Sequence, residues 1–120
     1  MATITHTIIP DPTIETTRVK WLNMANGDVG DTAVELGFYS DRSVQVTGTF
    51  GTGGSVSLKG SNDGGTTWAT LTDPSGSAIT FTATGLKQIL HLPHKIRPEV
   101  TAGDGTTSLT VWVFMQGKMR

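Results

Sequence analysis

The sequence predicts an all-β protein: a single-domain antiparallel β-sandwich or barrel of about eight to ten short strands, preceded by an extended N-terminal arm. The chain of 120 residues has the length of one domain. Thr is its commonest residue, 15 residues are Gly and only 16% are charged, which favours strands and tight turns over surface helices. Apolar residues also alternate with polar ones at a period of two, in segments about 10 residues apart.

Residues 1–12 form the expected arm, and residues 13–120 form the expected sandwich domain. Along the arm, Ile and His residues alternate with Thr, and the alternation ends at Pro10 and Pro12. This pattern indicates an extended segment that is tied only loosely to the body. We expect His6 to be exposed on it.

The first half of the domain contains four expected strands. Residues 13–24 are apolar on both parities, which indicates a bulge or two buried faces, and Asn26-Gly27 forms a tight turn after them. In the next three segments the apolar residues share one parity: Val34, Leu36 and Phe38, then Val44, Val46 and Phe50, then Val56 and Leu58. Each of these strands therefore has one face for a core, and residues 51–54 join two of them as a hairpin.

The second half begins after a turn signal at residues 73–76. Ile79 and Phe81 come first, then residues 88–92, then an alternating segment over residues 96–100. Pro93 and Pro98 cannot donate to a β-ladder, so we expect this region at a sheet edge or in a corner.

The last strand, residues 109–115, is apolar on both parities. Leu109, Val111, Val113 and Met115 share one parity, and Trp112 and Phe114 share the other. A sandwich buries one face of a strand, so the second face must meet an arm, a neighbouring subunit or a host surface. This strand is the best internal indication of oligomerisation.

Residues 61–68 fit the pattern S-x-D-x-G-x-T-W at each specified position: Ser61, Asp63, Gly65, Thr67 and Trp68. The segment resembles the Asp-box of sialidases and other β-propellers. That pattern describes a hairpin turn, in which the Asp accepts backbone N–H groups, Gly supplies positive φ and the Trp packs across the turn. A propeller needs a copy in every blade, about 40 to 50 residues apart, and the sequence has no second copy. We therefore interpret the motif as a structural turn.

Composition argues against several classes of function. A formal net charge of −1 gives no electrostatic footprint for nucleic acid. The chain has no Cys, so neither disulfides nor thiolate zinc sites can hold the fold. No apolar run approaches the roughly 20 residues of a membrane span, and the first residues lack the pattern of a signal peptide. We expect synthesis in the cytoplasm without export, and neither nucleic acid nor a membrane as a partner.

The sequence contains no assembled catalytic or metal-binding constellation. His91 and His94 have an H-x-x-H spacing, but Leu92-Pro93 between them excludes a helix and leaves no metal geometry. The aspartates adjoin turn residues, which explains them without catalysis or a calcium loop. The Gly-rich run 48–54 lacks the Lys-Ser/Thr pair of a phosphate loop. We expect no enzyme activity and no cofactor, although sequence leaves open a carboxylate pair that meets only in space, as in glycosidases.

The three tryptophans could stack on sugars if they were exposed. Our preferred interpretation is that Trp68 closes its hairpin and that Trp21 and Trp112 are core or interface aromatics, because Trp buries a large area wherever it lies.

Four segments, in this order, carry a wider resemblance: the Asn26-Gly27-Asp28 turn, YSDRSVQVTGTFG at 39–51, VSLKGSNDGGTTW at 56–68 and IRPEVTAGDGTTS at 96–108. Over about residues 20–115 the chain resembles small virion proteins of tailed bacteriophages. Within that group it is most similar to capsid decoration, or cement, proteins, which are β-rich, often trimeric and bound outside the shell. The resemblance implies a non-enzymatic virion protein on the capsid surface, with the major capsid protein as its partner. It also implies a homo-oligomer, for which a trimer is favoured and a dimer stays open.

On this hypothesis the partner-binding residues are Ile4, Ile8 and Ile9 on the arm and Trp112 and Phe114 on the last strand. The arm would lie along the capsid or a neighbouring copy as an added β-strand, and the two aromatics would bury a subunit interface. Two alternatives stay open. A tail, neck or baseplate component would have the same composition, and a carbohydrate-binding adhesin would need exposed aromatics.

Overall fold

The computed structural model describes residues 2–10, 16–31, 41–91 and 93–116. These residues form strands and turns without a helix, which confirms the predicted all-β fold. The strands are β1 (Thr3–Ile4), β2 (His6–Pro10), β3 (Thr16–Met24), β4 (Val29–Gly30), β5 (Asp41–Thr49), β6 (Ser55–Ser61), β7 (Ala69–Thr70), β8 (Thr80–Phe81), β9 (Gly85–Gln88), β10 (Lys95–Ala102) and β11 (Ser108–Gln116). The expected strand at Val34, Leu36 and Phe38 lies outside the described residues.

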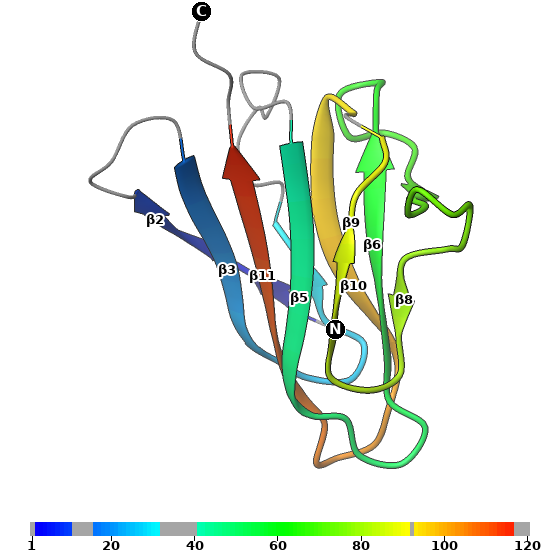
Figure 1. The fold of residues 1–120 in the computed structure, drawn as a ribbon. Helices are drawn as coiled ribbons and strands as arrows, with labels where there is room; N and C mark the ends of the chain where they lie inside the picture. The colour runs from blue at the N-terminus through cyan, green and yellow to red at the C-terminus, as the bar shows by residue number, and fades with distance from the viewer. Residues whose placement is uncertain (1, 11–15, 32–40, 92, 117–120) are drawn as a thin grey trace, which may run out of the picture.

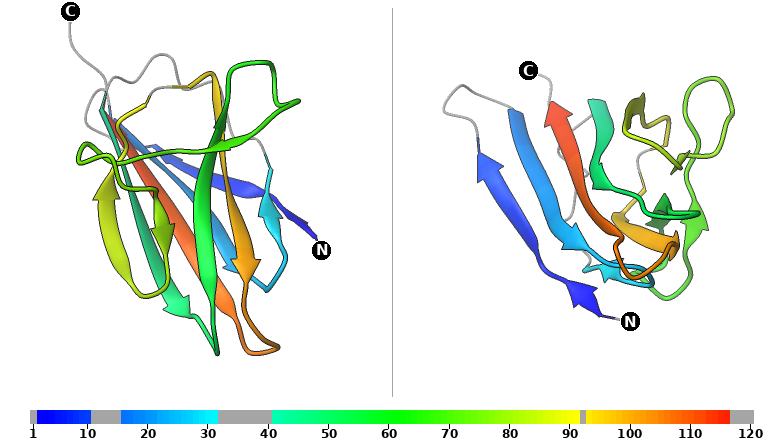
Figure 2. Two further views of the ribbon diagram at one scale, coloured as in Figure 1. Left: turned by 90° about the vertical axis from the view of Figure 1, so that its right-hand side faces the viewer. Right: turned by 90° about the horizontal axis from the view of Figure 1, so that it is seen from below.

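The strands form two sheets that pack face to face as a sandwich (Figure 1 and Figure 2). One sheet has five strands in the order β2-β3-β11-β5-β9. The other has six, in the order β1-β4-β10-β6-β7, with β8 also paired to β6. The long strands pair antiparallel, and the short β1 pairs parallel with β4. The right-hand view of Figure 2, from below, shows the two layers and the curve of the five-stranded sheet.

The core lies between the sheets and follows the period-two alternation of the sequence. In β11 the residues Leu109, Val111, Val113 and Met115 are buried, and Trp112 and Phe114 are not. The core includes Val19, Trp21, Met24, Val44, Val46, Val111 and Val113 from the five-stranded sheet and Val56, Leu58, Ile96 and Val100 from the six-stranded sheet. Trp21 is completely buried, which confirms it as a core aromatic.

A β-bulge explains the mixed parity of β3. Leu109 pairs with Met24 and Val111 pairs with Trp21, so β3 has one residue more than β11 over this interval. Asn23 takes a positive φ of 56° there. The extra residue returns Met24 to the inner face on which Trp21 lies, and the predicted bulge is confirmed.

The N-terminal residues differ from the loose arm that we expected. β2 pairs antiparallel with β3 over residues 6–10, and β1 pairs with β4 in the opposite sheet. The backbone N–H of Ala2 donates to the carboxylate of Asp28 at 3.0 Å. The described residues 2–10 therefore form edge strands of both sheets.

The proline-rich region is only partly at an edge. Pro98 lies inside β10, which pairs with β6 along its whole length. On its other side β10 pairs with β4 at a single position, Glu99 with Val29. Pro98 has no N–H to donate toward β4. This loss is tolerated because β4 is too short to form a continuous ladder with β10 there.

Gly30, in β4, lies so close to its neighbours that a side chain has no room. An added Cβ would lie 2.6 Å from Cδ of Pro98 and 2.7 Å from Nε1 of Trp21. We expect Gly30→Ala to lower the free energy of unfolding by about 1–3 kcal/mol, because the strand must shift to admit the methyl group. Chemical denaturation measures this change. Gly105→Ala is the matched control, since its methyl would meet nothing within 4 Å, and equal losses in both variants would contradict the close packing.

Candidate functional site

The carboxylate of Asp63 organises the turn that follows β6. Its Oδ1 accepts the backbone N–H groups of Thr66 and Thr67 at 3.0 and 2.9 Å and the hydroxyl of Ser61 at 2.7 Å. These bonds, first the N–H of Thr67 and then the Ser61 hydroxyl, hold the pKa of Asp63 well below its usual range. The carboxylate is committed to its own loop.

Trp68 closes the same turn. Its indole N–H donates to the carbonyl of Gly65 at 3.0 Å, and Gly64 and Gly65 have positive φ of 81° and 96°. The guanidinium of Arg97, on β10, lies 4.2 Å from the centroid of the Trp68 ring. One face of this indole is therefore stacked against a cation.

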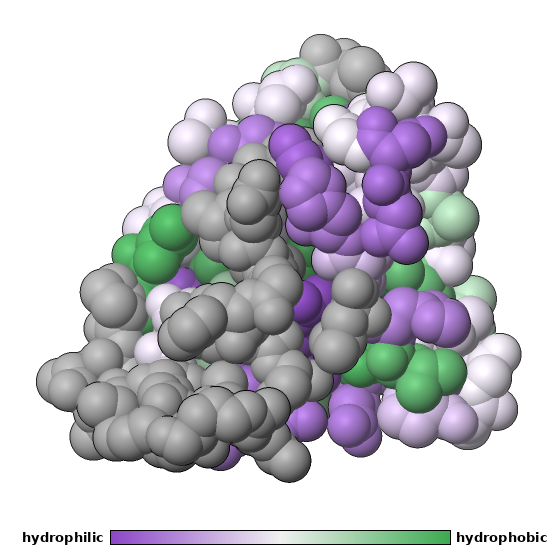
Figure 3. Space-filling view, turned by 90° about the horizontal axis from the view of Figure 1, so that it is seen from above, coloured by the Kyte–Doolittle hydropathy of each residue, from purple (hydrophilic) through white to green (hydrophobic). Residues whose placement is uncertain are grey.

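A hollow of about 510 Å³ lies beside this turn, between Trp68, Leu71, His91 and Pro93. Its polar groups are engaged with protein: Nε2 of His91 lies 3.1 Å from the Thr72 hydroxyl, and Oδ1 of Asn62 accepts the N–H of His94 at 2.8 Å. Figure 3 looks down on this end of the sandwich and shows hydrophilic residues gathered there, with smaller hydrophobic areas between them. Among the described residues, no three His, Asp or Glu side chains form a potential metal site.

The outer face of the five-stranded sheet carries the two aromatics that the sequence singled out. Trp112 and Phe114 project from β11, the central strand, and Phe114 is 37% exposed. Lys20 and Arg18, on β3, lie 5.0 and 5.9 Å from the centroid of the Trp112 ring. Such cation–π contacts contribute about 0.5–1 kcal/mol at exposed sites and hold the indole and the cations together.

A second hollow, of about 350 Å³, lies on this outer face. Trp112, Phe114 and Leu86 form its walls, and Arg18 of β3 and Ser43 and Gln45 of β5 also line it. Leu86, on the edge strand β9, is 66% exposed. Sequence analysis missed Leu86 because nothing in its local pattern shows that β9 pairs beside β5.

The three isoleucines that we expected to bind a partner do not share one surface. Ile4 packs against the core. Ile8 is exposed and pairs with Val19, whose side chain points inward, whereas Ile9 pairs with Arg18 on the outer face. Only Ile9 therefore lies on the face that carries Trp112 and Phe114.

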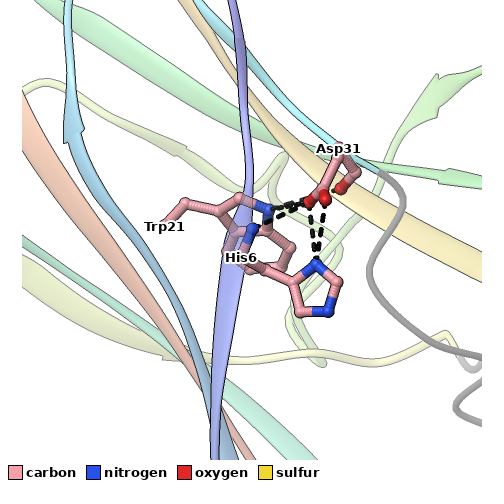
Figure 4. Close-up of polar contacts among 3 residues, drawn as sticks. All are labelled: His6, Trp21 and Asp31. Carbon is pink, nitrogen blue, oxygen red and sulfur yellow. Dashed lines mark hydrogen bonds and ion pairs between the residues drawn. The ribbon is translucent and has the colours of Figure 1, made fainter.

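A polar cluster anchors the N-terminal strand, as Figure 4 shows. Nδ1 of His6 lies 2.9 Å from Oδ1 of Asp31, and the same oxygen accepts the backbone N–H of His6 and the indole N–H of Trp21, each at 3.0 Å. The His6 side chain is only 17% exposed, so our expectation that it is exposed was wrong. The partners lie 25 residues apart, and no local signal in the sequence points to them.

The described residues contain no helix that is long and apolar enough to cross a membrane.

No family model and no curated protein matches the sequence. Among solved structures, the fold is similar to the crystal structure of the SPBc2 prophage-derived protein YomS, with a TM-score of 0.60 and 15% sequence identity. The match covers 89% of this chain and 98% of that chain. The similarity therefore extends over the whole sandwich, and at this identity it establishes a shared fold.

The Asp63 turn makes stability depend on acid pH. Because folding lowers the pKa of this carboxyl, its stabilising effect is complete above the ordinary Asp pKa of about 3.9 and is lost progressively as the pH falls from that value through the lower pKa of the folded state. We expect the Tm of the wild type to fall on acidification through this range, and to fall less in Asp63→Asn, which keeps the acceptor oxygen but gains no proton. Thermal melts across the range measure this, and parallel curves would contradict it.

Removing the carboxylate of Asp31 tests its role in anchoring the N-terminal strand. Asp31→Ala leaves the buried indole N–H of Trp21 with only the Asp31 carbonyl at 3.3 Å, so we expect a loss of about 1–3 kcal/mol in the free energy of unfolding. Amide hydrogen exchange should rise most in β2, because His6 loses its anchor. Thr70→Ala, at an exposed strand position in the other sheet, serves as the control, and unchanged protection of β2 in Asp31→Ala would refute the anchoring role.

Proposed function

We propose that this chain is a non-enzymatic structural protein of a tailed-bacteriophage virion. The observation that carries the proposal is a fold shared, over nearly all of both chains, with a protein described as prophage-derived. The sequence resemblance to small phage virion proteins supports the same class independently of that fold. Within this class we propose capsid decoration: the protein binds the outside of the shell, contacts the major capsid protein and stabilises the lattice after synthesis in the host cytoplasm.

Two physical principles explain how a small sandwich protein can stabilise a capsid shell. A protein that binds the assembled lattice but not its separated subunits favours assembly by linkage. Many copies, each bound weakly, suffice when several contacts are made at once. The fold supplies exposed surfaces for such contacts without a cofactor: the edge strand β2, with the exposed Ile8, and the outer face with Trp112 and Phe114.

The positions of the tryptophans decide which of them can be used to test the alternative of a carbohydrate-binding protein. Trp21 is completely buried, so it offers no platform for a sugar. Trp112 lies on the outer face of the five-stranded sheet, and its ring already contacts Lys20 and Arg18. A glycan array comparing the wild type with Trp112→Ala would support an adhesin only if binding appears and the substitution removes it.

Binding to phage heads tests the decoration role. We expect purified protein added to heads that lack it to bind over the whole shell and to raise the temperature at which the heads release their DNA, because bound copies stabilise only the assembled lattice. Electron microscopy with a labelled antibody locates the protein, and thermal DNA release measures its effect. Heads incubated with an unrelated β-sandwich protein are the control.

Label confined to the portal or tail would replace decoration with a tail, neck or baseplate role. Absence of the protein from purified virions would refute the virion assignment itself. Deleting residues 2–10 is unsuitable as a test of partner binding, because it removes β1 and β2 from the sandwich together with any contact to the capsid.

A further inference from the structure

The outer face of the five-stranded sheet has two halves of different chemistry. Strand pairing places side chains in rows across the sheet. From β2 to β9, one row contains Thr7, Lys20, Trp112, Gln45 and Leu86. The next row contains Ile9, Arg18, Phe114, Ser43 and Gln88. The β3 side therefore carries two long cations, the β5 side carries neutral hydrogen-bonding groups, and an aromatic strip on β11 separates them.

The relief of this face is uneven. The hollow of about 350 Å³ lies where the aromatic strip meets Leu86, and it is lined by Ser43 and Gln45 of β5 and by Arg18 of β3. Nζ of Lys20 lies 5.0 Å from the centroid of the Trp112 ring, on the β3 side of the strip. The face therefore has a recess beside Leu86, and a lysine covers the indole on the opposite side of β11.

The face has the dimensions of a stable protein interface. Five strands about 4.8 Å apart span about 20 Å, and the nine residues of β11 extend about 30 Å, at about 3.4 Å each. A footprint of this size is of the same order as the roughly 800 Å² that each partner contributes to a standard interface. Phe114 is 37% and Leu86 66% exposed in the isolated chain, so a partner would remove apolar surface from water.

We propose that two copies of this chain pack outer face to outer face about a two-fold axis that runs along β11. Rotation about such an axis reverses the order of the strands within each row of the second copy. Lys20 of one copy then faces Gln45 of the second copy, and Arg18 faces Ser43. Trp112 and Phe114 lie on the axis and meet their own counterparts. The contact is isologous, and the same patch serves both copies.

The charged side chains favour this axis over the second possible two-fold axis in the plane of the interface, which runs across the strands. An axis across the strands would place β3 of one copy over β3 of the other, and Lys20 and Arg18 would meet the same cations of the second copy. Like charges placed together oppose association. Along β11, the cations instead meet the amide oxygen of Gln45 and the hydroxyl of Ser43. Asp41 lies two residues before Ser43 on the same face, within reach of a long Arg side chain.

The same axis also matches shape. It brings Lys20 of the second copy over the recess beside Leu86, where its aliphatic stem packs against Trp112 while its charged end reaches polar groups. Sheets packed in this way keep their strands nearly aligned, as in ordinary β-sandwiches. The dimer buries the second apolar parity of β11, which the sandwich itself leaves outside.

Single-cysteine variants test the axis directly, because the chain has no native Cys. Packed sheets lie about 10 Å apart, so a short bismaleimide that joins two thiols is the suitable reagent. We expect an equal mixture of Lys20→Cys and Gln45→Cys to give a covalent dimer on a denaturing gel, and each variant alone to give little. Lys20→Cys mixed with Thr101→Cys, an exposed position on β10 in the other sheet, is the control and should not cross-link. Cross-linking of Lys20→Cys to itself, with no gain in the mixture, would overturn the axis.

Sedimentation velocity tests the association itself. We expect a wild-type dimer whose dissociation constant rises about tenfold or more in Trp112→Ala and in Phe114→Ser, since aromatics at the centre of an interface dominate its affinity. Leu90→Ser, at an exposed apolar position outside this sheet, should leave the constant unchanged. A wild-type monomer at every concentration would overturn the dimer. The inference does not rest on the virion proposal, because self-association of the purified chain is measured without phage heads.

Discussion

The pairing of β11 with β3 and β5 is the constraint on which the rest of this structure depends. These three strands have nine residues each, and β11 lies between the other two. Because side chains alternate between faces, this register places Val111 and Val113 in the core and leaves Trp112 and Phe114 outside. A slip of one residue would exchange the two faces. The core and the exposed aromatic strip therefore follow from the same set of backbone hydrogen bonds.

The edge of the sandwich at which the chain begins is held by polar contacts. Asp31 follows β4 of one sheet, whereas His6 and Trp21 belong to β2 and β3 of the other. A single carboxylate oxygen accepts hydrogen bonds from both strands, so it links the sheets where β1 and β2 pass from one to the other. A buried indole N–H needs an acceptor, and this requirement fixes Asp31 beside Trp21 and makes the N-terminal strands part of the fold.

Three aspartates have carboxylates that belong to the turns in which they lie. Asp63, Asp73 and Asp104 accept hydrogen bonds from their own or adjoining loops. The pKa of Asp63 is lowered first by the backbone N–H of Thr67, and the pKa values of Asp73 and Asp104 first by the hydroxyls of Ser75 and Thr106 and then by backbone N–H groups. Carboxylates held in this way stay ionised and act as parts of turns. On the outer sheet face, by contrast, large apolar and cationic side chains lie together without contributing to the core. These three acids hold their turns together, whereas the outer sheet face keeps aromatic and basic side chains at the surface.

The sequence by itself determined the fold class, the parity of β11, the bulge in β3 and the turn at residues 61–68, because each is a local pattern of alternation or turn chemistry. Tertiary structure alone decided the rest. The strands at residues 3–10 follow from contacts with β3, β4 and Asp31, which no local pattern encodes. The place of Leu86 beside Trp112 likewise depends on β9 pairing with β5, some 40 residues away in the chain. Local sequence fixes which way a side chain points from its strand, but only strand order decides which side chains become neighbours.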